Sequence, residues 1–302
     1  MVDFEIKTKQ LIDSLKGICA SYGLGNDGNE FKIITQVFLY KFLNDKFAFE
    51  LKKINKDVAN AGVKWEEAYI SLSDNDKDML RFELGGKTAF LNSEHLISTL
   101  FNRQNESDFA KLFDDTLRDI AKQNNDIFAV KTDGGTKITL FEQNGLSNFI
   151  SDESKRDSFC RAIINKLADF SFEQIFKEKF DFFATIFEYL IKDYNKDSGG
   201  KYAEYYTPHA VAKIMASIMV KGDVKNVSCY DPSAGSGTLL MNIAHAIGED
   251  NCTIYSQDIS QKSSNLLRLN LILNNLVHSI SNIIQGNTML HPYFKDGNNL
   301  KK

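Results

Sequence analysis

The feature that most constrains the fold is a glycine-rich turn at residues 231–238 (DPSAGSGT), which follows a short apolar run, 227–231 (VSCYD). A helical pattern begins at about Gly237 and continues to Ile247, where Gly248 is a natural stop. A second strand pattern at 253–256 (TIYS) precedes a helix that Ser260 can cap and that runs to about Leu273, and a third strand pattern follows at 281–285 (SNIIQ). Strands that alternate with helices predict a parallel, doubly wound sheet.

The first half of the chain has a different pattern. Apolar residues recur at helical spacing in 4–20 and 30–54, and further helical stretches cover 93–123 and 154–168. The turn Asp133-Gly134-Gly135 between two short apolar runs predicts a hairpin. The aromatic stripes are interpreted as core packing. We therefore expect a helical domain over residues 1–170 and an α/β domain over residues 171–302.

Composition limits the classes of function. The net charge of −4 gives no support to nucleic-acid binding, although local patches or partner subunits can supply a positive field. The four cysteines are far apart and form no C-x-x-C pair, so no zinc site is predicted and buried thiols in a reducing compartment are expected. The sequence has no long apolar run and no apolar N-terminal segment, and a cytoplasmic protein is the expectation.

The glycine-rich turn lies where parallel sheets bind ligands, at the carboxyl end of a strand. Gly235 and Gly237 allow unusual backbone dihedrals and a close approach to a ligand. A dinucleotide motif would need a third glycine where Leu240 stands, and a phosphate-binding loop would need a lysine that the turn lacks. Asp231 suits a cationic ligand with an amino group, such as the methionine part of S-adenosylmethionine. The alternative is a turn that only connects strand to helix.

Two polar residues follow the second and third strands. Asp258 comes just past the second strand and can accept hydrogen bonds from both hydroxyls of a ribose, or it is an ordinary acid favoured by the following helix dipole. Asn287, after the third strand, can hydrogen-bond an adenine amino group, or it is a polar loop residue.

Residues 204–208 (EYYTP) precede another predicted helix. Thr207 is the expected N-cap and Pro208 the expected first helical residue, which leaves Tyr205 and Tyr206 unexplained. An apolar stripe then follows, made of Val211, Ile214, Met215, Ile218 and Met219.

Taken in order, the segments FEYLI, EYYTP, DPSAGSGTLL, SQDIS and GNTML between about Asp181 and Leu290 resemble the modification subunit of type I restriction systems (HsdM-like, the N6-adenine DNA methylase family). The helical first half resembles that family's N-terminal domain with weaker motif support. The resemblance implies a Rossmann-like methyltransferase fold and site-specific adenine-N6 methylation of DNA. It also implies partners, namely DNA, a specificity subunit, a second modification subunit and a restriction subunit, and it implies no membrane.

The resemblance assigns S-adenosylmethionine as cofactor and places its binding residues by position. The tyrosine-bearing segment would cover the methionine end, the glycine-rich turn would form the cofactor loop, Asp258 would bind the ribose, and Asn287 stands where the family often has Asp. The residues so implied are Glu204, Tyr205, Tyr206, Thr207, Pro208, Asp231, Ser233, Gly235, Ser236, Gly237, Thr238, Asp258 and Asn287.

One departure bears on activity. The family catalyses with Asn-Pro-Pro-Phe or Asn-Pro-Pro-Tyr, and this sequence contains neither tetrapeptide. Those groups hold the extruded adenine for in-line transfer, so no methyl transfer by this chain alone is expected and no catalytic residue or metal ligand is assigned. A sheet that stops after about three strands, with an open edge, suggests a truncated polypeptide or a disrupted gene. Two alternatives remain: a non-catalytic helical module that binds DNA or a partner, and a nicotinamide-dependent oxidoreductase.

Overall fold

The computed structural model describes residues 2–25, 28–173, 175–177, 186, 189, 207–296, 299 and 300. The chain divides into two compact units. The first comprises Met1–Asn124 and Phe141–Leu190, and the second comprises Asn125–Leu140 and Ile191–Lys302. Among the described residues, no helix combines the length and the apolarity that a membrane span requires. Nor do those residues include a group of three His, Cys, Asp or Glu side chains placed to hold a metal ion.

The first unit is helical, as the sequence predicts. Its helices are α1 (Val2–Ser21), α2 (Gly28–Ile54), α3 (Lys56–Asn60), α4 (Trp65–Ile70), α5 (Asp74–Leu84), α6 (Ile97–Arg103), α7 (Phe109–Gln123) and α9 (Arg156–Ala168). Most residues of α2 are buried, which makes this helix the core of the unit. The single helix predicted over 93–123 is instead interrupted between α6 and α7, where Asp108 adopts a left-handed backbone conformation (φ 58°) that a helix cannot contain.

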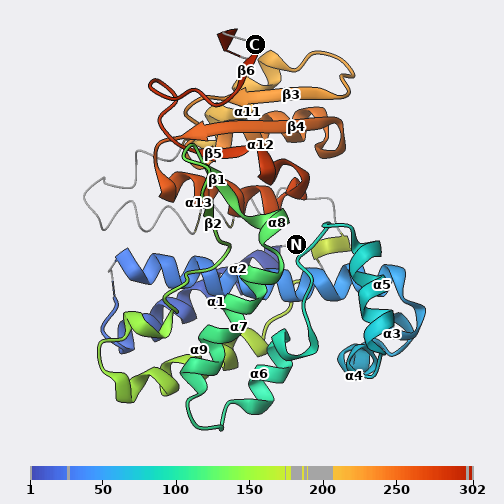
Figure 1. The fold of residues 1–302 in the computed structure, drawn as a ribbon, viewed down its shortest axis with the longest axis vertical. Coiled ribbons are helices and arrows are strands. Elements are labelled where there is room, and N and C mark those ends of the chain that lie inside the picture. The colour runs from blue at the N-terminus through green and yellow to red at the C-terminus, as the bar shows by residue number, and fades with distance from the viewer. Residues whose placement is uncertain are drawn as a thin grey trace. The chain divides into compact units, whose positions relative to one another are not determined.

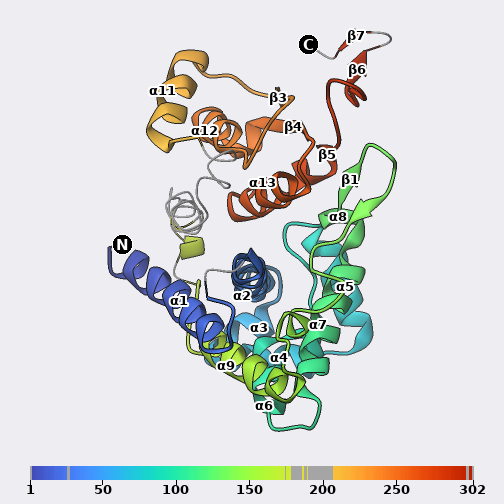
Figure 2. The ribbon, with the colours of Figure 1, turned by 90° about the vertical axis from the view of Figure 1, so that its left-hand side faces the viewer.

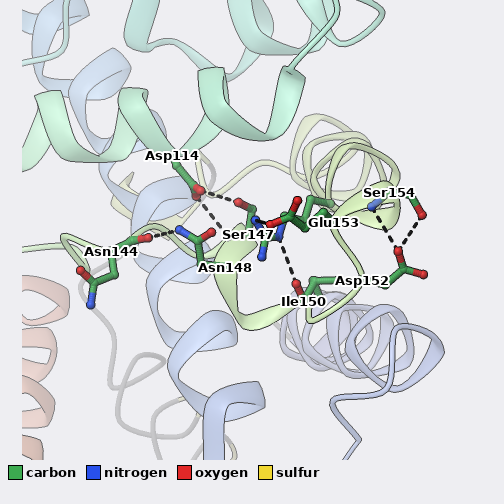
Figure 3. Close-up of polar contacts among 9 residues, drawn as sticks. Asp114, Asn144, Ser147, Asn148, Ile150, Asp152, Glu153 and Ser154 are labelled. Carbon is green, nitrogen blue, oxygen red and sulfur yellow. Dashed lines mark hydrogen bonds and ion pairs between the residues drawn. The ribbon is translucent and has the colours of Figure 1, made fainter.

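A buried carboxylate fixes the loop that precedes α9 (Figure 3). Asp114, on α7, accepts hydrogen bonds from the backbone N–H of Leu146 at 2.8 Å and of Ser147 at 3.2 Å, and from the Ser147 hydroxyl at 2.6 Å. Burial raises the pKa of Asp114 although all three hydrogen bonds lower it. Gly145 has φ 80° and lies so close to the Asp114 carboxylate that a larger residue would clash there.

We expect Asp114→Ala to lower the free energy of unfolding by about 2–3 kcal/mol, because it leaves three donors in the buried loop without their acceptor. Urea denaturation followed by circular dichroism measures this loss. The matched control is Asp115→Ala on the same helix, whose side chain is 42 % exposed and forms a surface ion pair with Arg118, so a change within about 0.5 kcal/mol is expected. Equal losses for the two variants would contradict the structural role of Asp114.

The second unit is a mixed, mostly parallel sheet with helices. Its elements are α8 (Asn125–Phe128), β1 (Val130–Thr132), β2 (Lys137–Ile138), α11 (His209–Met219), β3 (Val227–Asp231), α12 (Thr238–Ile247), β4 (Cys252–Asp258), α13 (Gln261–Leu273), β5 (Ile283–Gln285), β6 (Lys295–Asp296) and β7 (Asn299–Leu300). The five-stranded sheet has the order β2-β1-β5-β4-β3 (Figure 1). The strands β6 and β7 form a separate antiparallel pair (Figure 2). This arrangement confirms the predicted helical region followed by an α/β sheet.

The sheet contains two strands more than the three expected from the second half of the chain. The predicted hairpin at 128–141 supplies them: β1 runs parallel to β5, with Lys131 opposite Ile284 and Thr132 opposite Gln285, and β2 pairs antiparallel with β1. In Figures 1 and 2 the green hairpin lies beside the red β5. The hairpin therefore pairs with one side of the three expected strands, next to β5, while β3 is the edge strand on the other side.

Arg268 attaches the hairpin segment to α13. Its guanidinium is buried and donates hydrogen bonds to four backbone carbonyls, those of Phe128 at 3.3 Å, Ile138 at 3.0 Å, Thr139 at 2.9 Å and Leu140 at 3.3 Å. The Asn265 side chain, one turn earlier on α13, accepts another at 3.0 Å. Burial lowers the pKa of Arg268 to about 10, so the side chain still carries its charge at neutral pH.

Helix α11 packs on α12 through small residues. Ala212 and Ala216 are its buried positions, while the apolar stripe noted in the sequence is exposed. Alanines allow the close approach of two helix axes, and the larger apolar side chains of α11 then point away from α12. Pro208, with φ −54° and ψ 129°, is the N-cap of α11, and the helix begins at His209, one residue later than predicted. Helix ends commonly vary by one residue.

Candidate functional site

Most of the described residues that were predicted to bind a cofactor lie at one edge of the sheet in the second unit, whereas Thr207 and Pro208 precede α11. Asp231 is the last residue of β3 and Asp258 the last residue of β4, and Asn287 follows β5 directly after Gly286. Because these three strands are parallel, their carboxyl ends share one edge of the sheet. Glu204, Tyr205 and Tyr206 lie outside the described residues.

The Asp258 carboxylate organises the glycine-rich turn. Its Oδ2 accepts a hydrogen bond from the backbone N–H of Gly235 at 2.9 Å, and its Oδ1 accepts one from Ser260 at 2.9 Å. Each carboxylate oxygen can accept a second hydrogen bond, so Asp258 still has acceptors for a ribose. Sequence reasoning assigned Asp258 to a ligand and did not foresee that its carboxylate fixes the turn after the neighbouring strand.

Asp231 faces an unfavourable environment for its charge. Burial raises its pKa above the usual range of an aspartic acid, and the negative charge of Asp258 raises it further. The backbone N–H of Ser233, which donates to Asp231 Oδ1 at 2.9 Å, opposes that shift only in part. A cation placed beside the two carboxylates would relieve their repulsion, so the edge is suited to a ligand that carries positive charge.

The two glycines of the turn have the dihedrals that the sequence predicted, with φ 55° at Gly235 and φ 82° at Gly237. The backbone of Gly237 lies so close to α13 that a Cβ there would collide with the Leu267 side chain. The sequence had predicted a close approach of this glycine to a ligand. Gly237 is also the N-cap of α12, and its N–H donates to Ala234 at 2.8 Å. Glycine at this position therefore serves the packing of the turn on the sheet and its helices.

Ser236 and Thr238 are buried, and their hydroxyl oxygens lie 3.1 Å apart. Their carbonyls accept hydrogen bonds from two buried amides, Asn270 at 3.2 Å and Asn242 at 2.8 Å. Asn242 also lies 3.3 Å from Nδ1 of His209, which links the start of α11 to α12. Sequence reasoning missed these supporting residues, because an asparagine inside a helix gives no signal of its tertiary partner.

The loop after β5 contacts the glycine-rich turn that follows β3. The Thr288 hydroxyl donates to the carbonyl of Pro232 at 2.7 Å, so this loop reaches across β4 to the glycine-rich turn. Asn287 Oδ1 accepts from the N–H groups of Met289 at 3.0 Å and Leu290 at 3.1 Å. Three large apolar side chains at this edge are exposed, namely Ile259, Met289 and Leu290. Exposed apolar groups beside carboxylates are suited to a ligand that has both a flat base and polar groups.

Comparison with known proteins gives a consistent result. The family model described as N-6 DNA Methylase matches residues 178–302. The type I restriction enzyme MpnII methylase subunit of Mycoplasma pneumoniae is 25% identical over 94% of this chain and 52% of its own length. The MjaVIII methylase subunit of Methanocaldococcus jannaschii is 22% identical over 88% of this chain and 41% of its own length. The chain thus spans about half the length of these curated relatives.

The fold has a solved counterpart. The methyltransferase subunit of a type I restriction-modification system from Streptococcus thermophilus superposes with a TM-score of 0.71 at 19% identity, over 97% of this chain and 61% of that one. This likeness extends over both the helical region and the sheet. Residues 178–302 therefore match the N-6 DNA methylase family, and nearly the whole chain is similar to the methylase subunits of type I restriction enzymes.

Proposed function

We propose that this chain is the S-adenosylmethionine-binding part of a subunit that methylates adenine N6 in DNA. The observation that carries the proposal is the pair of carboxylates at the ends of β3 and β4, where the charge of Asp258 helps to raise the pKa of Asp231. The methionine end of S-adenosylmethionine supplies an ammonium and a sulfonium, whose positive charges would offset those of the two carboxylates. The alternative function of a nicotinamide-dependent enzyme agrees less well with this edge, because the two carboxylates would repel the pyrophosphate of its cofactor.

Each part of the edge then has a role in binding. Asp231 holds the cofactor's amino group, Asp258 accepts the ribose hydroxyls while it keeps the turn in place, and Ile259 and Met289 flank the base. The backbone of Ser233 and Gly235 passes close to the ligand, with Ser236, Gly237 and Thr238 fixing that backbone from behind. When bound, the cofactor supplies the methyl group that is transferred.

DNA, a specificity subunit, a second modification subunit and a restriction subunit are proposed as partners because the chain is similar to methylase subunits of type I restriction enzymes. The net charge of −4 agrees with binding of DNA in a complex, because the positive field that attracts DNA would come mainly from other chains. Since the chain lacks Asn-Pro-Pro-Phe and Asn-Pro-Pro-Tyr, we propose that it binds the cofactor and transfers no methyl group by itself.

Calorimetric titration of the full chain tests this function. We expect S-adenosylmethionine and S-adenosylhomocysteine to bind with dissociation constants of roughly 1–100 μM, while NADH gives no heat of binding. Incubation with tritiated S-adenosylmethionine and duplex DNA should leave the DNA unlabelled. Binding of NADH without binding of S-adenosylmethionine would refute the proposal, and labelled DNA would refute the part that concerns inactivity.

A further inference from the structure

The tip of the hairpin lies at the same sheet edge as the proposed cofactor site. Since β1 is parallel to β5, the turn that follows β1 emerges beside the loop that follows β5. Pairing continues one residue beyond the strand, because the N–H of Asp133 donates to the carbonyl of Gln285 at 2.9 Å. The N–H of Gly286 in turn donates to the carbonyl of Asp258 at 2.8 Å. The backbones of Asp133, Gly286 and Asp258 are therefore neighbours along this edge.

The Asp133 carboxylate lies directly over Gly286. A Cβ built on Gly286 would lie 2.5 Å from both Cγ and Oδ2 of Asp133, so only glycine leaves room for this carboxylate. Asp133 is exposed, and within the described part of the chain its carboxylate oxygens accept no hydrogen bond. An exposed carboxylate held in place at a ligand-binding edge, without a partner in the protein, is available to a ligand donor.

The neighbouring Asn287 is poorly placed to supply that acceptor. Its side-chain oxygen already accepts two backbone N–H groups, those of Met289 and Leu290, which leaves mainly its amide N–H groups for a ligand. An adenine amino group is a hydrogen-bond donor and needs an acceptor. The carboxylate next to Gly286 is that of Asp133, and it can supply such an acceptor.

We propose that Asp133, carried by a hairpin from the first half of the chain, accepts a hydrogen bond from the exocyclic amino group of the cofactor's adenine. This inference rests on the proposed function and adds a specificity-determining residue to it. The hairpin then has two tasks: it completes the sheet beside β5, and it supplies the group that distinguishes adenine from other purines. The backbone hydrogen bonds that connect Asp133 and Gly286 to the ends of β5 and β4 set the position of Asp133.

The test compares S-adenosylhomocysteine with its deamino analogue, in which purine replaces adenine, by calorimetry on the full chain. The wild type is expected to bind the adenine compound about tenfold more tightly. In Asp133→Ala that preference should vanish, because affinity for the adenine compound falls about tenfold while affinity for the deamino analogue stays. Asp133→Asn, which keeps an acceptor oxygen without the charge, should retain part of the preference.

The matched control is Asp126→Ala, which removes an exposed acid of α8 that is ion-paired with Lys137 at 2.9 Å in the same segment. This variant should keep the full preference. Two results overturn the inference while leaving the proposed function intact: equal binding of both ligands by the wild type, or equal weakening of both by Asp133→Ala, which would indicate a general electrostatic effect. Failure of the wild type to bind S-adenosylhomocysteine would instead refute the proposed function, and the inference with it.

Discussion

Replacing Asp231 by asparagine is expected to weaken S-adenosylmethionine binding on the order of 30- to 100-fold, which corresponds to the loss of a charge-assisted hydrogen bond in a partly buried site. Asparagine keeps an oxygen that can accept from the N–H of Ser233, so the turn after β3 should stay as it is. Calorimetry on the two proteins measures the ratio of dissociation constants. The effect should be smaller for an analogue that lacks the amino group, because Asp231 is proposed to bind that group.

The same substitution is expected to stabilise the folded protein at neutral pH. Because burial and Asp258 raise the pKa of Asp231 in the folded state, the folded protein prefers the neutral acid and charging it costs stability. That cost is absent below the pKa of the unfolded chain, grows as the pH rises from that value to the raised pKa, and is constant at higher pH. Asp231→Asn should therefore have the higher melting temperature at pH 8, with the difference shrinking in acid. Cofactor binding by the wild type should weaken as the pH falls through the same raised pKa.

Asp250→Asn is the control for both effects. Asp250 is an exposed acid of the same unit and lies just before β4 begins, at the opposite end of that strand from Asp258. Its replacement removes one negative charge and should alter neither cofactor affinity nor the pH dependence of melting. Equal weakening in Asp231→Asn and Asp250→Asn would show that net charge governs binding, and Asp231 would then be removed from the site.

The sequence predicted the alternating part of the chain well because its signals are local. The strand β3 (Val227–Asp231) was expected with the bounds it has, Ser260 caps α13 through a hydrogen bond from the N–H of Ser263, and α13 ends at Leu273. Gly248 ends α12 in the same way. Caps, glycine stops and short apolar runs depend on neighbours within a few residues, so a single sequence is enough to read them.

What the sequence did not predict depends on contacts between distant segments. The hairpin around Asp133 was expected, but nothing local shows that β1 would pair with β5. The exposure of the α11 stripe follows from its small face, Ala212 and Ala216, being the one that meets α12. The contact of Gly237 with Leu267 of α13 also joins distant segments, so the sequence predicted a close approach to a ligand there and did not predict this contact. The role proposed for Asp133 could not arise until the fold brought it next to Gly286.

Replacing Arg268 by methionine is expected to lower the free energy of unfolding of the second unit by about 3–5 kcal/mol. Methionine fills a similar volume but donates no hydrogen bond, and the four carbonyls between Phe128 and Leu140 would lose their shared partner. Urea denaturation gives the loss in stability. Hydrogen exchange should localise it, because the amides of 128–140 become exchangeable before those of β3 and β4.

Lys213→Met is the matched control, since it makes the same kind of change at an exposed position of α11 and should shift stability within about 0.5 kcal/mol. Retained protection of residues 128–140 in Arg268→Met would show that pairing of β1 with β5 holds the hairpin without the guanidinium. The variant also separates the two halves of the proposed site. Asp231 and Asp258 are anchored by β3 and β4, so affinity for the cofactor's charged end should persist, whereas Asp133 depends on the hairpin, so the preference for adenine over purine should fall.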